Sequence, residues 1–257
     1  MTGRQFGGEV VLITGGASGI GAATARRLAG HGRRVAVADV DTRGATAVAE
    51  ECGGLFVRTD VASADDNERA VARTVEEFGR LDAVVLNAAI PGRCGLDDFT
   101  PQRYRDTLRT DLDGVAYGLH AALPRLRRQG GGHLVVTGSL AGLTGSPDVF
   151  YATAKHALVG LVRSAAPLLR RDRIRLNVVC PGLVDTPAFT SRRTALLSHG
   201  LLLAAPDEVA AAIETVLADE RTGHAWAVQA GRPATPVEWP EIPLVSRGAA
   251  AGRGGTP

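Results

Sequence analysis

The chain has 257 residues, 45% of them hydrophobic, and a formal net charge of +2, which is typical of one α/β domain with a substantial core. Its small basic excess is scattered, which argues against a nucleic-acid-binding surface, and no apolar run reaches the roughly 18 residues of a membrane span. The amino terminus lacks the apolar stretch of a secretory signal, and the three cysteines, Cys52, Cys94 and Cys180, are far apart. We therefore expect reduced thiols and a cytoplasmic protein that binds neither nucleic acid nor membrane.

Short runs rich in β-branched residues alternate with longer helical patterns along the chain. Strands are predicted at 9–14, 34–39, 54–58, 82–86, 132–138, 173–179 and 224–229, and helices at 19–31, 42–52, 64–79, 101–129, 149–171 and 207–219. Several strand runs are almost continuously apolar, as strands buried on both faces must be. The predicted fold class is a single-domain, Rossmann-like, doubly wound α/β fold with a seven-stranded parallel sheet and helices on both faces.

The first predicted strand runs directly into Thr14-Gly15-Gly16-Ala17-Ser18-Gly19-Ile20-Gly21 and then into a helix. Glycines let the backbone turn tightly and approach a pyrophosphate, whose charge is met by the amide groups and dipole of the helix. We expect Gly15, Ser18, Gly19, Ile20 and Gly21 to bind a dinucleotide cofactor there.

Asp39 ends the second predicted strand, at about the 20-residue distance expected in such sites. A carboxylate in this place accepts hydrogen bonds from the adenosine ribose and repels a 2′-phosphate. The alternative is a turn residue at a strand end. The pattern predicts NAD rather than NADP as the cofactor.

Lysine occurs once, at Lys155, in a chain with 28 arginines, and it follows Tyr151 by four residues. Residues four apart lie on one face of a helix, so the ammonium would lie near the phenol. A compact ammonium and a planar guanidinium are not interchangeable beside a reacting group. We therefore interpret Lys155 as functional, with a solvated surface charge as the alternative.

Thr-Gly-x-x-x-Gly-x-Gly followed downstream by Tyr-x-x-x-Lys resembles the short-chain dehydrogenase/reductase family, and the resemblance runs from about Gly8 to Gly231. It implies that Ser139 is a catalytic residue together with Tyr151 and Lys155, both of which also contact the cofactor. The family's Asn-Ala-Gly reads Asn87-Ala88-Ala89 here. The further cofactor-binding residues that the resemblance implies are Asp60, Val61, Asn87, Ala88, Pro181, Gly182, Val184 and Thr186.

The expected chemistry follows from the residue types. A free tyrosine has a pKa of about 10, so a catalytic phenolate needs stabilisation, which the Lys155 ammonium and an oxidised nicotinamide provide. Tyr151 would then remove the alcohol proton as hydride passes to the nicotinamide, or donate it during ketone reduction. Ser139 would hold the substrate oxygen by a hydrogen bond.

One departure from the family matters for the chemistry: the family carries Asn where this chain has Asp111. Asp111 could keep only the backbone role of that Asn, whose carbonyl holds a water behind the lysine. Alternatively, its carboxylate pairs with Lys155 or joins the proton relay, which would offset part of the pull on Tyr151 and raise the pH optimum. Lost catalysis is the third possibility.

Substrate choice is weakly encoded. The segment at about 188–205 corresponds to the family's mobile lid, and its leucines predict an apolar cover that excludes water. Arg192 or Arg193 would either bind an anionic substrate or be solvated. No metal site is predicted, because the histidines lack the spacing of metal ligands. The expected substrate wall consists of Ile90, Arg93, Leu140, Phe150 and Leu183.

We assign residues 1–231 to the dinucleotide-binding and catalytic domain, and 232–257 to a Pro/Gly-rich tail that is a loop or an arm against a partner subunit. The predicted activity is NAD(H)-dependent hydride transfer between nicotinamide and a secondary alcohol or ketone of a small, cyclic metabolite. The alternatives are an NADPH-dependent ketoreductase of secondary-metabolite (antibiotic) biosynthesis and a catalytically silent dinucleotide-binding module. The resemblance also implies a homodimer or homotetramer, with the helices at 101–129 and 149–171 packing across a two-fold axis.

Overall fold

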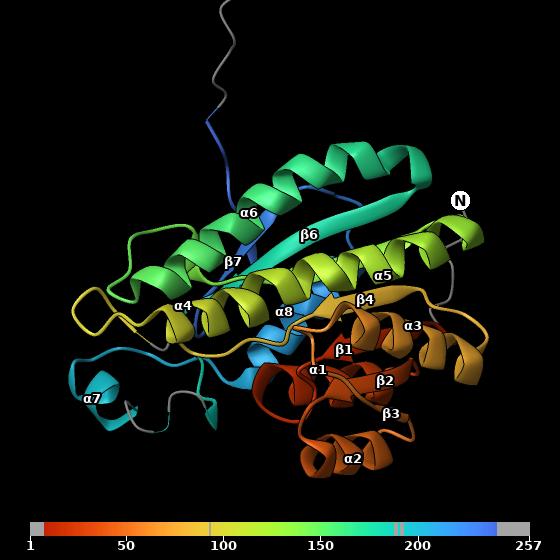
Figure 1. Cartoon of the computed structure of the whole chain (residues 1–257), viewed down its shortest axis with the longest axis horizontal. Coiled ribbons are helices and arrows are strands. Elements are labelled where there is room, and N and C mark those ends of the chain that lie inside the picture. The colour runs from red at the N-terminus through yellow and green to blue at the C-terminus, as the bar shows by residue number, and fades with distance from the viewer. Residues whose placement is uncertain (1–7, 93, 188–189, 191–192, 241–257) are drawn as a thin grey trace, which may run out of the picture.

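A computed structural model describes residues 8–92, 94–187, 190 and 193–240. Its strands form one sheet in the order β3-β2-β1-β4-β5-β6-β7-β8, with helices on both faces (Figure 1). The first seven strands are parallel, so the predicted doubly wound, Rossmann-like α/β class is confirmed. Within the described part of the chain, we find no helix with the length and apolar composition to span a bilayer.

The elements follow the predicted alternation of strands and helices. The strands are β1 (Val10–Thr14), β2 (Arg34–Asp39), β3 (Leu55–Arg58), β4 (Ala83–Leu86), β5 (Gly132–Thr137), β6 (Ile174–Pro181), β7 (Ala225–Val228) and β8 (Thr235–Pro236). The α-helices are α1 (Gly19–Gly30), α2 (Thr42–Glu51), α3 (Ala64–Phe78), α4 (Pro101–Leu108), α5 (Gly114–Gln129), α6 (Val149–Leu169), α7 (Arg193–Ser198) and α8 (Pro206–Ala218). The turns are η1 (Arg109–Asp113, π-helical), η2 (Leu140–Gly142) and η3 (Arg170–Asp172), the last two being 3₁₀.

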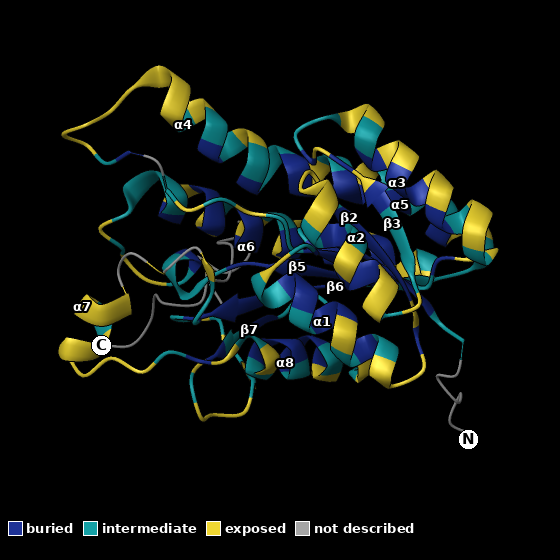
Figure 2. Cartoon of the chain, turned by 90° about the horizontal axis from the view of Figure 1, so that it is seen from below, coloured by how far each residue is buried: buried dark blue, intermediate teal, exposed yellow. Residues whose placement is uncertain are grey.

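The sheet separates two hydrophobic cores, and it lies buried at the centre of the molecule while α7 is exposed (Figure 2). Alternate residues of a strand point to opposite faces. Leu12 therefore packs in the core with α3, α5 and α6, whereas Val11 and Ile13 pack in the core with α1, α2 and α8. Because β1, β4, β5 and β6 are parallel neighbours in the sheet, the loops that follow them lie together at one edge of the sheet.

Some elements differ from those predicted, among them α7, a short helix within the predicted lid. The single helix predicted at 101–129 is interrupted by the π turn η1, which widens the helix locally without ending it. In the predicted tail, β8 pairs antiparallel with β7, so the sheet has eight strands rather than seven. The Val237 N–H donates to the Ala225 carbonyl at 2.7 Å, and Trp239 packs against the core beside the Arg163 guanidinium. Residues 241–257 of the predicted tail lie outside the described residues.

Candidate active site

The ends of β1, β4 and β5 are tied together by side chains that bond to the backbone. Asn87 Nδ2 donates to the carbonyls of Thr14 and Gly15 at 3.1 and 3.2 Å. Thr14 Oγ1 accepts from the backbone N–H groups of Asn87 and Ala88 at 3.0 and 3.2 Å. Thr137 Oγ1, at the end of β5, donates to Asn87 Oδ1 at 3.1 Å. The predicted residues Asn87 and Ala88 therefore lie directly beneath the glycine-rich turn.

The turn between β1 and α1 has no room for a side chain at Gly15 and Gly21, where an added Cβ would meet backbone atoms. A Cβ on Gly21 would lie 2.1 Å from the Gly15 carbonyl oxygen, and a Cβ on Gly15, whose φ is +67°, would lie 2.7 Å from Ala88 Cα. Ser18, the residue before α1, forms no side-chain cap, and the first turn of α1 contains no acidic residue. The amide groups at this helix start are therefore available to an anionic ligand such as a pyrophosphate.

Asp39 is held at the end of β2 by backbone donors. Its Oδ2 accepts from the Ala17 N–H at 2.9 Å, and its Oδ1 accepts from the Asp41 N–H at 3.0 Å. Arg58 lies opposite Asp39 in the parallel pairing of β2 with β3. The carboxylate is thus fixed beside the glycine-rich turn, and a cationic side chain lies on the neighbouring strand.

The remaining predicted cofactor residues follow β3 and β6. Asp60 is exposed, whereas Val61 is buried against the start of α5 at Gly114. After β6, the Gly182 N–H donates to Val228 O at 2.9 Å, and Val184 forms an isolated bridge with Ala204. Thr186 packs against Gly19, where a Cβ would lie 3.1 Å from its Cγ2. The segment that begins at Pro181 therefore extends across the start of α1.

Lys155 and Tyr151 lie one turn apart on α6. The Lys155 side chain is buried, with 1% of the residue exposed, and its Nζ lies 5.3 Å from the centroid of the Tyr151 ring. Nζ donates to the carbonyl of Thr137 at 3.3 Å. Ser139 follows β5, and its Oγ accepts from the Ala141 N–H at 3.1 Å. These contacts bring the carboxyl end of β5 and the first two turns of α6 together around the ammonium.

Asp111 is fully buried on the π turn, 3.3 Å from Lys155 Nζ through its Oδ2. Its Oδ1 accepts from the Ile90 N–H at 2.8 Å. Burial raises the pKa of Asp111, and the nearby ammonium offsets part of that rise. Burial by itself lowers the pKa of Lys155, but the charges of Asp111 and Tyr151 outweigh it and raise this pKa. Lys155 is therefore an ammonium at neutral pH.

The predicted substrate residues divide by location. Ile90 lies in the loop after β4, and Leu140 begins η2 close to Gly182, the residue before Leu183. The Phe150 ring packs against the rings of Phe99 and Tyr104, at centroid distances of 5.3 and 5.1 Å, toward α4. Arg93 lies outside the described residues.

The predicted lid contains α7 and a stretch of exposed leucines. Arg193 Nε donates to both carboxylate oxygens of Asp185 at 3.0 Å, which fixes the start of α7 to the segment after β6. Leu197, Leu201 and Leu202 are exposed. Arg192 lies outside the described residues. Arg193, one of the two arginines considered for an anionic substrate, therefore has an acidic partner within the chain.

Three residues of this site were absent from the predicted set: Thr14 and Thr137 as supports of Asn87, and Asp185 as the partner of Arg193. Thr14 and Thr137 each end an apolar strand run, so a polar residue at a strand end was the available signal. Nothing comparable marks Asp185. No group of three or more His, Cys, Asp or Glu side chains suited to a metal ion is found among the residues that the structure describes.

Comparison with known proteins identifies the class. Residues 9–196 match the short chain dehydrogenase family. Levodione reductase of Leifsonia aquatica is 40% identical over 192 residues, which cover 71% of this chain and 72% of that protein. Cyclohexanol dehydrogenase of an Acinetobacter species is 34% identical over 227 residues, covering 84% and 90%. The structure of 3-ketoacyl-(acyl-carrier-protein) reductase from Brucella melitensis with NADH superposes with a TM-score of 0.81 at 28% identity, covering 88% and 99%.

The chain belongs to the short-chain dehydrogenase/reductase family, as the two sequence motifs predicted. It is accordingly an oxidoreductase of the class that acts on CH–OH groups, and the family binds a nicotinamide dinucleotide. The glycine-rich turn and the uncapped start of α1 fit such a cofactor, because both leave room and donors for its pyrophosphate.

Proposed function

We propose that the chain transfers hydride between NAD(H) and a secondary alcohol or ketone carried on a small ring. The observation that carries this proposal is the buried Lys155 ammonium beside Tyr151, at the sheet edge where α1 begins. The ring is inferred from the names of relatives such as cyclohexanol dehydrogenase. The mainly apolar residues of the predicted substrate wall agree with a small uncharged ring.

Each catalytic residue has a distinct task in this proposal. A bound nicotinamide supplies the hydride acceptor or donor. The Tyr151 phenolate accepts the alcohol proton during oxidation, and the phenol returns it during reduction. The Lys155 ammonium stabilises that phenolate. Ser139 Oγ, which accepts from the Ala141 N–H, keeps its hydroxyl hydrogen for the substrate oxygen.

The test is a hydride-transfer assay with secondary alcohols and ketones, including cyclohexanol, in the presence of each dinucleotide. We expect reduced nicotinamide to appear with NAD and a ring alcohol, with a higher kcat/KM than for an acyclic alcohol of the same size. Higher kcat/KM with NADPH would instead favour the ketoreductase of secondary metabolism. Cofactor binding without turnover across the whole panel would favour the catalytically silent module.

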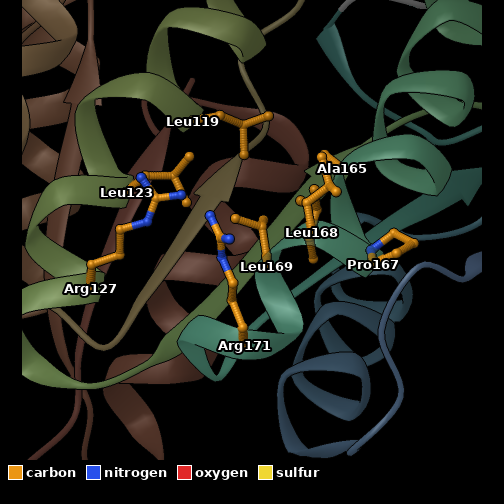
Figure 3. A pocket seen from close by; sticks show the side chains of 9 residues that line it. Leu119, Leu123, Arg127, Ala165, Pro167, Leu168, Leu169 and Arg171 are labelled. Atoms are coloured by element: carbon orange, nitrogen blue, oxygen red, sulfur yellow. The ribbon is translucent and has the colours of Figure 1, made fainter.

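We further infer that the chain forms a homodimer or homotetramer through α5 and α6. A hollow of about 490 Å³ between these helices has an apolar floor that includes Leu119, Leu123 and Leu169, with Arg127 and Arg171 at its rim (Figure 3). Leu168, beside it, is 70% exposed, and burying such an apolar face against a second copy is favourable.

Replacing Leu168 with Asp is expected to dissociate the oligomer, because the new carboxylate would be buried at the two-fold interface without a partner. Sedimentation velocity measures the change in mass. Leu202→Asp, which alters another exposed leucine at 75% exposure on the lid, is the matched control and should leave the mass unchanged. A monomeric parent protein would contradict the inference.

A further inference from the structure

The Asp111 carboxylate joins two parts of the site that come from different elements. One oxygen accepts from the Ile90 N–H at 2.8 Å, in the loop after β4, and the other faces Lys155 Nζ at 3.3 Å on α6. Asp111 and Lys155 are 0% and 1% exposed, so water does not screen their attraction. The Ile90 N–H and the Lys155 ammonium are both donors. An asparagine in the same pose has only one oxygen, so it could accept from one of them and would turn its NH₂ group toward the other. The position is built for a carboxylate.

The charges around this pair decide what the pair does to Tyr151. Asp111 interacts with Lys155 of α6 and with Asp148, the residue before α6, and Lys155 interacts in turn with Tyr151 of α6 and Cys180 of β6. Burial raises the pKa of Cys180 to about 12, so that thiol is neutral. Asp148 raises the pKa of Asp111 further, after the larger effects of burial and of Lys155. The Asp111–Lys155 pair therefore has one further carboxylate, that of Asp148, acting on it, and its ammonium is the charge that lies beside the phenol.

We propose that Asp111 is a positioning residue: as the counter-ion of Lys155 it fixes the ammonium and the loop after β4, and it offsets part of the ammonium's attraction for the Tyr151 phenolate. The proposal rests on the proposed function in taking Tyr151 as the base. It follows that alcohol oxidation requires a higher pH in this chain than it would with a neutral residue at position 111.

The first test removes the charge and keeps the shape. In Asp111→Asn, the phenolate of Tyr151 should form at a pH lower by on the order of one unit, because the ammonium beside it would lose its counter-ion. Ultraviolet titration of the cofactor-free protein measures this directly, with Tyr151→Phe subtracted to isolate the one phenol. The acid limb of kcat/KM for alcohol oxidation should move in the same direction. Asp113→Asn, the same change two residues along the π turn, is the matched control and should move neither.

The second test measures the coupling in the absence of turnover. Asp111→Asn, Lys155→Met and the double variant form a cycle whose Tm values are measured without cofactor. Each single change leaves a buried charge without its partner and should lower Tm on the order of 10 °C, whereas the double variant should lose clearly less than the sum. The double variant keeps the cycle informative even where one single variant folds poorly.

The outcomes are distinguishable. A lower titration midpoint together with non-additive Tm losses supports the proposal. An unchanged midpoint overturns it even when the Tm losses are non-additive, because the pair would then be only structural. Additive losses overturn it as well. Neither measurement needs a substrate, so failure of the proposed function would show separately, as absent hydride transfer in the parent protein.

Discussion

Tyr151→Phe is expected to lower kcat for ring-alcohol oxidation about a thousandfold while the protein remains folded. The change removes only a hydroxyl, and general acid–base groups contribute on the order of a hundred- to ten-thousandfold to such reactions. Lys155 would keep its contacts with Asp111 and Thr137, because neither involves the phenol. Stopped-flow measurement of reduced nicotinamide gives the rate, and fluorescence titration with NADH gives the binding constant, which should change by only a few-fold.

The matched control for this prediction is Tyr117→Phe on α5, which removes a tyrosine hydroxyl from another helix of the chain. Its kcat should equal that of the parent. Full turnover in Tyr151→Phe would contradict the assignment of the base. Loss of turnover in both variants would indicate a general effect of losing a hydroxyl rather than a catalytic one.

Asp39→Asn should lower the preference for NAD over NADP, measured as a ratio of kcat/KM values, by about ten- to a hundredfold. The change removes a carboxylate that would repel the 2′-phosphate, a difference of roughly 1.4 to 2.7 kcal/mol. It leaves Arg58 on the neighbouring strand and Arg43 near the start of α2 to attract that phosphate. The asparagine oxygen can still accept one of the two backbone bonds that Asp39 accepts.

Asp41→Asn provides the comparison for Asp39, since Asp41 is an exposed carboxylate two residues away that caps α2 through the Gly44 N–H. It should lower stability slightly and leave the cofactor preference unchanged. Equal loss of preference in both variants would show that net charge near α2, rather than a specific contact with the ribose, decides the choice. A parent protein that already prefers NADPH would contradict the argument from Asp39.

The alternation of strands and helices was predictable because a strand buried on both faces must be apolar throughout. The run from Val10 to Ile13 is an example: it is wholly apolar and is followed directly by a glycine-rich turn, which is the pattern of a buried strand. The π turn was not predicted, because the stretch 101–129 was interpreted as one continuous α-helix. Its effect is large nonetheless, since it lies where Asp111 faces Lys155.

The substrate side was harder to derive because tertiary packing decides it. Phe150 was expected in the substrate wall, which stays a prediction, and its ring packs against Phe99 and Tyr104. Such contacts depend on how α4 crosses α6, and no local pattern encodes that. The pairing of Asp111 with Lys155 was open for the same reason: the sequence offered it beside a purely backbone role, and the 3.3 Å contact between the two side chains shows that they pair.

The pairing of β8 with β7 has a consequence for how the molecule behaves in a crowded solution. Without β8, the outer N–H and C=O groups of Ala225–Val228 would be an open template on which another chain could add a strand. Pro236 lies in the covering strand and cannot donate a bond outward, so the addition stops there. The short strand β8 therefore protects the sheet from edge-to-edge aggregation.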